Sequence, residues 1–255
     1  GRSAPNDEAR LAIDEMRKGG VTVDARQCDV GRRENINTLV TAIEAAGRPL
    51  RGVFHLAGVL DDGVLREQSR ERFDRVLAAK ALGGWYLHER TRSAPLDHFV
   101  LFSSAASMLG SPGQGNYASA NALLDALAHH RRAARLPALS VNWGSWAEVG
   151  MAARLKETQG SRWAEAGIGW IDPEQGLRTL EELMLGNDAQ AGVLPMNWPR
   201  FFARIPVGAE PAWLSDLAAQ ARQAGGATDS GPPALLTQLN AVTPGERLET
   251  ALEFL

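Results

Sequence analysis

Residues 98–103 read His-Phe-Val-Leu-Phe-Ser, a short apolar run that predicts a buried strand. The alanine- and leucine-rich stretch from Asn116 to Arg135 predicts a helix, and Ala138–Trp143 predicts a further strand. Upstream, Gly52–Gly58 predicts another buried strand, and a long helical pattern runs from about Glu71 to Thr91. Strands that alternate with helices of this length need crossover connections, which produce a parallel sheet covered on both faces. The expected class is α/β, a Rossmann-like doubly wound parallel sheet in three α/β/α layers.

The first fifty residues predict two helices separated by an extended segment. The first helix begins at Asn6 or Asp7 and continues to Lys18, and the second runs from Arg33 to Ala46. Between them, Val21–Asp29 alternates apolar and polar residues, which is typical of a strand with one covered face.

A dinucleotide-binding fold has a glycine-rich turn directly after its first strand, where the backbone approaches the pyrophosphate. No such motif opens this sequence, and Gly110–Gly115 is rejected as a phosphate loop because it follows a mid-chain strand and contains a proline. Two interpretations stay open. Either the protein binds no nucleotide, or the sequence begins after the first βαβ segment of such a fold.

Composition changes along the chain predict three parts. Residues 1–220 hold the helices and strands and form the main domain, although the pattern becomes irregular beyond Asn197. Residues 221–233 are rich in glycine, proline and small residues, as in a linker. Residues 234–255 resume a helical period but are too few to bury a core, which predicts the truncated start of a second domain.

The composition also excludes several classes of protein. The chain has 255 residues, of which 44% are hydrophobic and 22% charged, so it is neither disordered nor fibrous. Its net charge of −3 argues against a nucleic-acid partner. The single cysteine, Cys28, forms no internal disulfide, and the histidines show no metal-ligand spacing. Without an apolar run of about 18 residues or a signal peptide, we expect a soluble cytoplasmic protein with no membrane partner.

Four polar residues have the clearest chemical meaning. Ser104 ends a predicted strand, where open α/β sheets bind their ligands. Tyr117 and Asn121 are spaced i and i+4, so they share one face of the next helix. Lys80 stands among alanines and a leucine in the preceding helix and is partly shielded from water. Each residue alone is more often ordinary packing or turn chemistry, but together they indicate a catalytic site.

These four residues suit the reduction of a ketone. Hydride arriving at the carbonyl carbon leaves negative charge on the oxygen, which requires a proton donor and a polarising hydrogen bond. Tyr117 is the expected donor, and the Lys80 ammonium is expected to lower the phenol pKa from its usual value of about 10. Ser104 would hydrogen-bond the carbonyl, and Asn121 would orient a water molecule or Lys80 in a proton relay.

Two motifs resemble those of a known family. The segments Val100–Ser107 and Gly113–Asn121, with Lys80 upstream, look like the ketoreductase domains of modular type I polyketide synthases, which are relatives of short-chain dehydrogenases/reductases. The resemblance extends from Arg2 to about Leu217. The family's glycine loop and the structural subdomain before it have no counterpart here, so we expect the chain to be part of a larger polypeptide.

The resemblance implies an activity, a cofactor and partners. The reaction would be NADPH-dependent reduction of a β-ketoacyl thioester to a β-hydroxyacyl thioester. The substrate would be carried on the phosphopantetheine arm of an acyl carrier domain, of which residues 234–255 would be the start. Other synthase domains in the same polypeptide would be further partners.

The resemblance also implies which residues contact the cofactor and the substrate. The positions that match the NADPH site are Arg2, Ser3, Asp29, Val30, Ala57, Gly58, Asn142 and Trp143. Leu60, Asp61 and Asp62 resemble the signature of B-type ketoreductases, which implies a D-configured (3R) hydroxyl. Ser119 stands where a proline marks reduction of an epimerised α-methyl substrate, which implies the non-epimerising subtype. Met151 belongs either to the core or to a lid that closes over the substrate.

Two other functions stay open at this point. The domain could be a non-catalytic, structural copy of the fold, or a free-standing short-chain dehydrogenase. Retention of all four polar residues argues against the structural copy, and the carrier-like tail argues against the free-standing enzyme.

Overall fold

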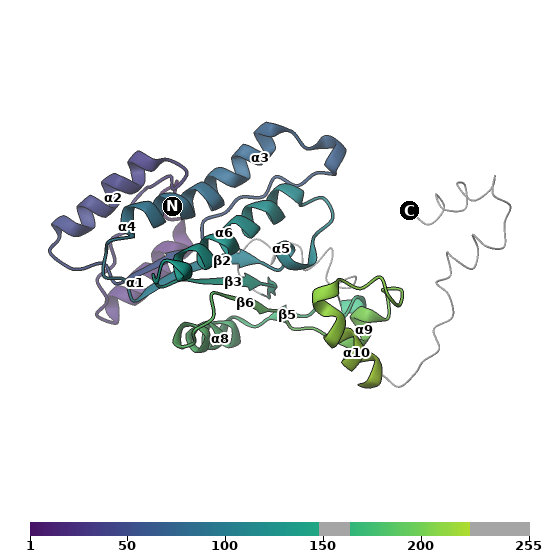
Figure 1. Cartoon of the computed structure of the whole chain (residues 1–255). Helices are drawn as coiled ribbons and strands as arrows, with labels where there is room; N and C mark the ends of the chain where they lie inside the picture. Colours follow the sequence, from purple (N-terminus) through teal and green to yellow (C-terminus); the bar gives the residue numbers. More distant parts are fainter. Residues whose placement is uncertain (148–163, 225–255) are drawn as a thin grey trace. The chain divides into compact units, whose positions relative to one another are not determined.

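A four-stranded parallel sheet forms the centre of the fold (Figure 1). In the computed structural model, which describes residues 1–147 and 164–224, the strand order is β1-β2-β3-β6. These strands are β1 (Gly52–His55), β2 (His98–Ser104), β3 (Leu139–Trp143) and β6 (Gln190–Val193). Every neighbouring pair is parallel, and helices connect successive strands. The predicted α/β class with a Rossmann-like parallel sheet is confirmed.

Helices lie before, between and after the strands. In chain order, the remaining elements are α1 (Asp7–Lys18), α2 (Arg33–Ala45), η1 (Leu65–Glu67), α3 (Arg70–Leu77), the π-turn η2 (Ala78–Leu82), α4 (Gly83–Thr91), α5 (Ala106–Leu109), α6 (Gly115–Ala133), β4 (Ser145–Trp146), β5 (Trp170–Ile171), α8 (Pro173–Leu185), α9 (Trp198–Phe202), η4 (Ala212–Leu214) and α10 (Ser215–Ala224). Residues 1–147 with 171–194 form one unit, and residues 164–170 with 195–224 form a second.

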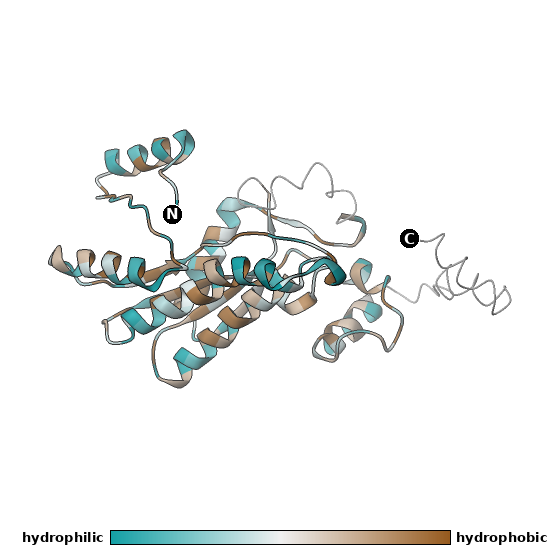
Figure 2. Ribbon diagram, turned by 90° about the horizontal axis from the view of Figure 1, so that it is seen from above, coloured by the Kyte–Doolittle hydropathy of each residue, from teal (hydrophilic) through white to brown (hydrophobic). Residues whose placement is uncertain are grey.

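Alternating side chains of β2 divide the core of the first unit into two layers. Phe99 and Leu101 pack on one face of the sheet with Leu124 of α6. Val100 lies on the opposite face and packs in the cluster that holds Leu180 of α8. Successive residues of a strand point to opposite faces, so an unbroken apolar run is buried only where both faces are covered. Figure 2 shows the resulting concentration of hydrophobic residues in the sheet.

The predicted strand at Val21–Asp29 is wrong. Within the described residues, no part of it pairs with a strand, and the Cys28 N–H instead donates to the main-chain oxygen of Gly1 at 2.8 Å. A strand requires hydrogen bonds to a neighbouring strand, and alternation alone supplies none. The flanking helices are confirmed as α1, whose first turn is capped by the Asn6 side chain, and α2.

The structure also contains elements that the sequence pattern did not single out. These elements are helix α8 and strand β6, which follows α8 and is the last strand of the sheet. The β6 sequence Gln190-Ala-Gly-Val193 is short and has no apolar run. Strand β6 is identified by its pairing with β3, in which Val193 lies beside Trp143. Because this signal is a long-range contact, a local window of sequence does not contain it.

The second unit is a small helical cluster. Trp198 stacks on Phe202 with ring centroids 5.7 Å apart, and both Phe202 and Leu214 are buried. Helices α9 and α10 pack against each other. The segment is therefore helical, although its prolines interrupt the helical period of its sequence. Helix α10 reaches Ala224, four residues into the predicted linker at 221–233, while the rest of that linker and residues 234–255 lie outside the described residues. No described helix is long and apolar enough to cross a lipid bilayer.

Candidate active site

The four residues predicted as a catalytic set meet at the carboxyl end of β2. Ser104 is the last residue of β2, and α6 carries Tyr117 in its first turn and Asn121 one turn later. The Tyr117 hydroxyl is near the side chains of Ser104 and Asn121, and both act to lower its pKa. Lys80 Nζ lies 5.3 Å from the centroid of the Tyr117 ring. Residues from three separate elements therefore surround one phenol.

Lys80 is a buried lysine in a widened helical turn. It belongs to the π-turn Ala78–Leu82 between α3 and α4 and is 3% exposed. Its ammonium donates to the main-chain oxygen of Phe102 at 2.8 Å. Burial lowers the Lys80 pKa to about 8, and the charge of Asp125 acts in the opposite direction. The side chain is therefore close to losing its proton at physiological pH, unlike a solvated lysine.

His55 and Gly58 hold the Lys80 turn in place. His55 Nε2 lies 2.8 Å from the main-chain oxygen of Lys80, and burial lowers the His55 pKa to about 4. The ring is therefore neutral near pH 7, and its proton is on Nε2 because a carbonyl oxygen only accepts hydrogen bonds. A Cβ at Gly58 would lie 3.0 Å from Lys80 Cε, so glycine lets the chain approach the lysine closely. Single π-turns of this kind are frequent at functional sites.

The structure corrects the predicted pKa shift of Tyr117. Burial raises its pKa, and the hydrogen bonds to Asn121 and Ser104 oppose that effect without reversing it. The expected lowering by Lys80 does not appear, because desolvation of the phenolate dominates and the burial of Lys80 weakens its own hold on a proton. Tyr117 is thus held as a neutral phenol, which is the form that can donate a proton.

Asn121 has an amide oxygen without a partner. The residue is fully buried, and its Nδ2 donates to the main-chain oxygen of Tyr117 at 2.8 Å. Its Oδ1 has no hydrogen-bond partner within the described residues. An unpaired buried acceptor costs about 1–3 kcal/mol, so this oxygen is suited to a donor such as a water molecule.

Asn142 and Trp143 are consecutive residues of β3, and both side chains are buried. Asn142 is fully buried, its Nδ2 lies 2.8 Å from Asp125 Oδ2, and its Oδ1 accepts from Gln190 Nε2 at 2.9 Å. Trp143 packs against Phe102 in the core cluster on the other face. The side chain of Asn142 is therefore occupied by internal partners, and the place of its segment beside a cofactor stays a prediction.

Sequence comparison identifies the family. Residues 1–148 match the family described as "KR domain". The chain belongs to the KR domain family. The predicted resemblance to the ketoreductase domains of modular polyketide synthases is confirmed, and with it the oxidoreductase class of the domain.

Relatives of this KR domain are large polyketide synthases. The chain is 36% identical over 247 residues to a phenolphthiocerol/phthiocerol polyketide synthase of Mycobacterium tuberculosis, covering 97% of the chain and 11% of that protein. It is 40% identical over 255 residues to the spectinabilin polyketide synthase system protein NorB of Streptomyces orinoci, with the same coverage of both. The chain thus spans about a tenth of the length of these relatives.

Solved ketoreductases share the fold of this KR domain. An A-type ketoreductase from a modular polyketide synthase matches with a TM-score of 0.76 and 38% identity, over 86% of this chain and 45% of the other. The ketoreductase from the first module of phoslactomycin biosynthesis in Streptomyces sp. HK803 matches with a TM-score of 0.78 and 32% identity, over 85% and 49%.

Asp61 of the KR domain forms ion pairs with two arginines of helix α3. Its carboxylate, 12% exposed, lies 2.9 Å from Arg72 Nε and 3.1 Å from an Arg75 guanidinium nitrogen. Its neighbours in the predicted entry motif are different, because Leu60 and Asp62 are exposed. The Asp61 side chain therefore fixes the loop, whereas Leu60 and Asp62 remain accessible to a ligand.

Asn116, which the sequence motifs did not mark as a site residue, connects this loop to the Tyr117 turn. Asn116 Nδ2 donates to the main-chain oxygen of Asp61, and its Oδ1 accepts from the Tyr117 N–H, both at 2.8 Å. Gln114 adds a hydrogen bond from Nε2 to Asp62 Oδ2 at 2.8 Å. The only sequence signal was that Asn116 precedes the candidate proton donor.

Val30, Ala57 and Gly58, three of the predicted cofactor positions, lie near the Lys80 turn. Arg2 and Ser3 are exposed, and the Gly1–Cys28 hydrogen bond places their segment beside Asp29. The Val30 side chain would lie 2.9 Å from a Cβ at Gly83, directly after the π-turn. Ala57, half-buried, precedes Gly58, which touches Lys80. Met151 lies outside the described residues.

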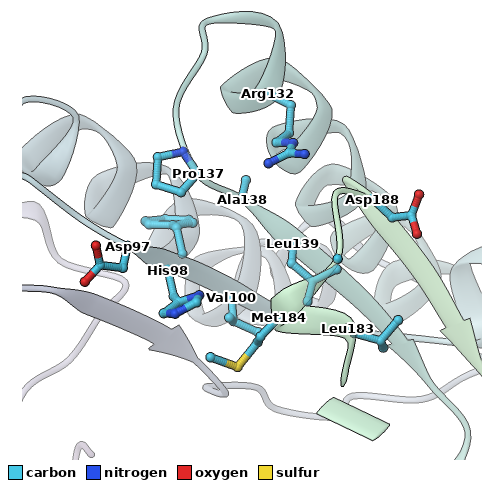
Figure 3. Close-up of a pocket in the computed structure, with 12 residues that line it drawn as sticks. Asp97, His98, Val100, Arg132, Pro137, Ala138, Leu139, Leu183, Met184 and Asp188 are labelled. Atoms are coloured by element: carbon cyan, nitrogen blue, oxygen red, sulfur yellow. The ribbon is translucent and has the colours of Figure 1, made fainter. Parts of the chain in front are cut away.

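A small pocket occupies the opposite end of the sheet (Figure 3). It has a volume of about 110 Å³ and is lined by the first residues of β2 and β3, with Arg132, Met184 and Asp188 around them. Ligands of open α/β sheets bind at the carboxyl ends of the strands, so this pocket is not the expected site of reduction. Within the described residues, no three His, Cys, Asp or Glu side chains are placed to hold a metal ion.

Proposed function

We propose that this KR domain reduces a carrier-bound β-ketoacyl thioester to a β-hydroxyacyl thioester, with NADPH as the reductant. The observation that carries the proposal is the Lys80, Ser104, Tyr117 and Asn121 cluster, in which a neutral phenol lies near the Ser104 and Asn121 side chains and beside a buried ammonium. Burial of a lysine without function is costly, which disfavours the alternative of a non-catalytic structural copy.

The residues present are compatible with a nicotinamide cofactor. Asn121 Oδ1 lacks a partner, and of the three N–H bonds of the Lys80 ammonium one is directed at Phe102, so donors and an acceptor remain for hydroxyl groups. Gly58 and Val30 would contact the cofactor beside Lys80, and Arg2 with Ser3 would hold its 2′-phosphate. When bound, NADPH supplies the hydride for the carbonyl carbon.

The chain's own residues control the charge and the proton. Ser104 donates a hydrogen bond to the substrate carbonyl and stabilises negative charge that develops on its oxygen. Tyr117 transfers its hydroxyl proton to that oxygen. Lys80 stabilises the resulting phenolate by charge, and Asn121 orients a water molecule that returns a proton through Lys80.

The expected product is the D-configured (3R) alcohol. The Leu60–Asp62 loop, which resembles the B-type signature, is joined to the Tyr117 turn through Asn116. The loop and the proton donor are therefore held in one relative position, and we infer that exposed Leu60 and Asp62 direct the phosphopantetheine arm to one face of the carbonyl. Ser119, which follows Tyr117 by two residues, favours a substrate that is not epimerised.

The test measures reduction and stereochemistry in one reaction. The natural polypeptide that carries this sequence is mixed with NADPH and a β-ketoacyl thioester of N-acetylcysteamine, which stands for the end of the phosphopantetheine arm. We expect NADPH oxidation that matches β-hydroxyacyl product and a predominantly D product on chiral chromatography. No turnover by folded protein would refute the proposed activity, and a mainly L product would refute only the B-type assignment.

Replacing Arg2 by alanine is expected to change cofactor preference. A guanidinium binds phosphate through charged hydrogen bonds, and only NADPH carries the 2′-phosphate. The KM for NADPH should rise about tenfold or more, while the KM for NADH stays nearly constant. Arg10→Ala serves as the control, because Arg10 is exposed on α1 and pairs with Asp7. Equal losses for both cofactors would remove Arg2 from the phosphate site.

A further inference from the structure

Asp125 is a buried carboxylate that the proposed mechanism does not use. It lies on α6 and is 8% exposed. Its Oδ1 accepts from Ser140 Oγ at 2.6 Å, and its Oδ2 accepts from Asn142 Nδ2 and Ser107 Oγ at 2.8 Å each. No ion pair to Asp125 occurs in the described part of the chain. Burying a charge is costly unless several donors stabilise it, so this arrangement requires an explanation beyond packing.

The hydrogen bonds of Asp125 lead to the end of β2. Asn142 Nδ2, besides its bond to Asp125, lies 3.1 Å from Ser103 Oγ and 3.4 Å from the main-chain oxygen of Ser104. Ser107 Oγ lies 2.8 Å from that same Ser104 oxygen. The carboxylate is thus joined, through the side chains of Asn142 and Ser107, to the backbone of Ser104 at the proposed site.

Asp125 also shares a helix face with the site. Tyr117, Asn121 and Asp125 are spaced at i, i+4 and i+8, so they follow one face of α6. Ser103 Oγ additionally donates to the main-chain oxygen of Asn121 at 3.3 Å, which joins β2 to this same face. Helix α6 contacts the π-turn that carries Lys80, and the negative charge of Asp125 favours the protonated form of that lysine.

We propose that Asp125 is a positioning residue that holds the Ser104 end of β2 against the Tyr117 face of α6 and supplies the buried negative charge for Lys80. Its effect on catalysis rests on the proposed function, whereas its effect on Lys80 can be measured without substrate. The other titratable side chains at Lys80 are His55 from β1, which is neutral near pH 7, and Tyr117 from α6, which is neutral as well. Among residues 1–147 and 164–224, Asp125 is therefore the negative charge that acts on this lysine.

The first test follows the titration of Lys80 in the Asp125→Asn variant. Lys80 is followed by ¹³Cε NMR in the natural polypeptide, where its signal is identified by its absence from Lys80→Met. We expect the Lys80 pKa to shift below its wild-type value of about 8, while the exposed Lys18 does not change. A purely structural role of Asp125 would not move this titration in folded protein.

The second test measures turnover of the same variant in the natural polypeptide. The amide of the Asp125→Asn side chain would place an NH₂ group, which is a donor, against the donors of Asn142 and Ser107. These two side chains would shift, and the main chain of Ser104 would lose part of the hydrogen bonding that positions it. We expect kcat to fall about tenfold or more with KM nearly constant, since the reacting groups are displaced but the cofactor and substrate contacts remain. Asp97→Asn is the matched control, because Asp97 is a partly exposed carboxylate before the other end of β2, paired with Arg51. It should change neither kcat nor the Lys80 titration.

Further measurements keep the proposal testable if Asp125→Asn does not fold. Ser107→Ala removes the single hydroxyl proton that Asp125 and the Ser104 main-chain oxygen share as acceptors but keeps the charge, so kcat should fall while Lys80 titrates normally. A Lys80 titration unaffected by Asp125→Asn, or wild-type kcat in both the Asp125 and Ser107 variants, would overturn the proposal. If wild-type protein makes no product, the proposed function fails, and the titrations alone decide the role of Asp125.

Discussion

Turnover is expected to fall about 10²-fold or more when Tyr117 is replaced by phenylalanine, which is the usual scale for losing a general acid. The variant keeps the ring that faces Lys80 but removes the hydroxyl that lies near Ser104 and Asn121. No other described phenol lies at the site, so the oxygen of the reduced carbonyl would have to take its proton from water. Binding of NADPH, measured by fluorescence or calorimetry, should change little.

The matched control is the other tyrosine of the chain. Tyr86 lies on α4, half-buried, with the Arg33 guanidinium 4.7 Å from its ring centroid. Tyr86→Phe removes one hydroxyl of the same chemistry away from the proposed site, and its kcat should stay within a factor of about two. Near-normal turnover of folded Tyr117→Phe would remove this residue from the mechanism, whereas equal losses in both variants would indicate a general effect on the fold.

Replacing Lys80 by methionine is expected to lower kcat/KM by roughly 10²-fold. Methionine approximates the lysine chain without its charge, so the developing phenolate loses the ammonium beside the ring. A unit charge at about 5 Å contributes about 3 kcal/mol at an effective dielectric constant of 20, and about 1.4 kcal/mol corresponds to a factor of ten. Lys18→Met, on the exposed surface of α1, should leave kcat/KM unchanged.

The same variant should also change the pH dependence. Burial lowers the pKa of Lys80 to about 8 in the free protein, so the ammonium is present below that pH and is lost as pH rises through it. Because kcat/KM reports ionisations of the free enzyme, the wild-type value should decline above about pH 8. Lys80→Met should remove this decline. A wild-type profile that stays flat to about pH 10 would exclude the ammonium as the active form.

Much of the scaffold follows from local sequence patterns. The apolar run in β2 is buried on both faces because its length and composition leave no polar side to expose, and α6 follows from its alanine and leucine content. The cluster of Ser104 with Tyr117 and Asn121 was predictable for a related reason. Parallel strands end at one edge of a sheet, and residues at i and i+4 share a helix face.

Other features depended on residues far apart in the sequence. Val21–Asp29 has the alternation of a strand but no partner within the described residues, while Gln190–Val193 lacks a strand pattern and pairs with β3. Asp61 could be interpreted from sequence as an exposed acid, yet Arg72 and Arg75 of α3 hold it in ion pairs. Such pairings are set by the approach of distant segments, which local propensity does not encode.

The sequence by itself determined the α/β class, the order of most helices and strands, and which four polar residues would meet at one edge of the sheet. Only the tertiary structure decided their electrostatic state. Lys80 has a pKa of about 8, and Tyr117 is held neutral, because their surroundings remove water that would stabilise the charged forms. It also placed the Asn142 side chain against Asp125, a contact that the sequence did not predict. Desolvation and buried hydrogen bonds depend on every neighbour that folding brings together, so no local motif specifies them.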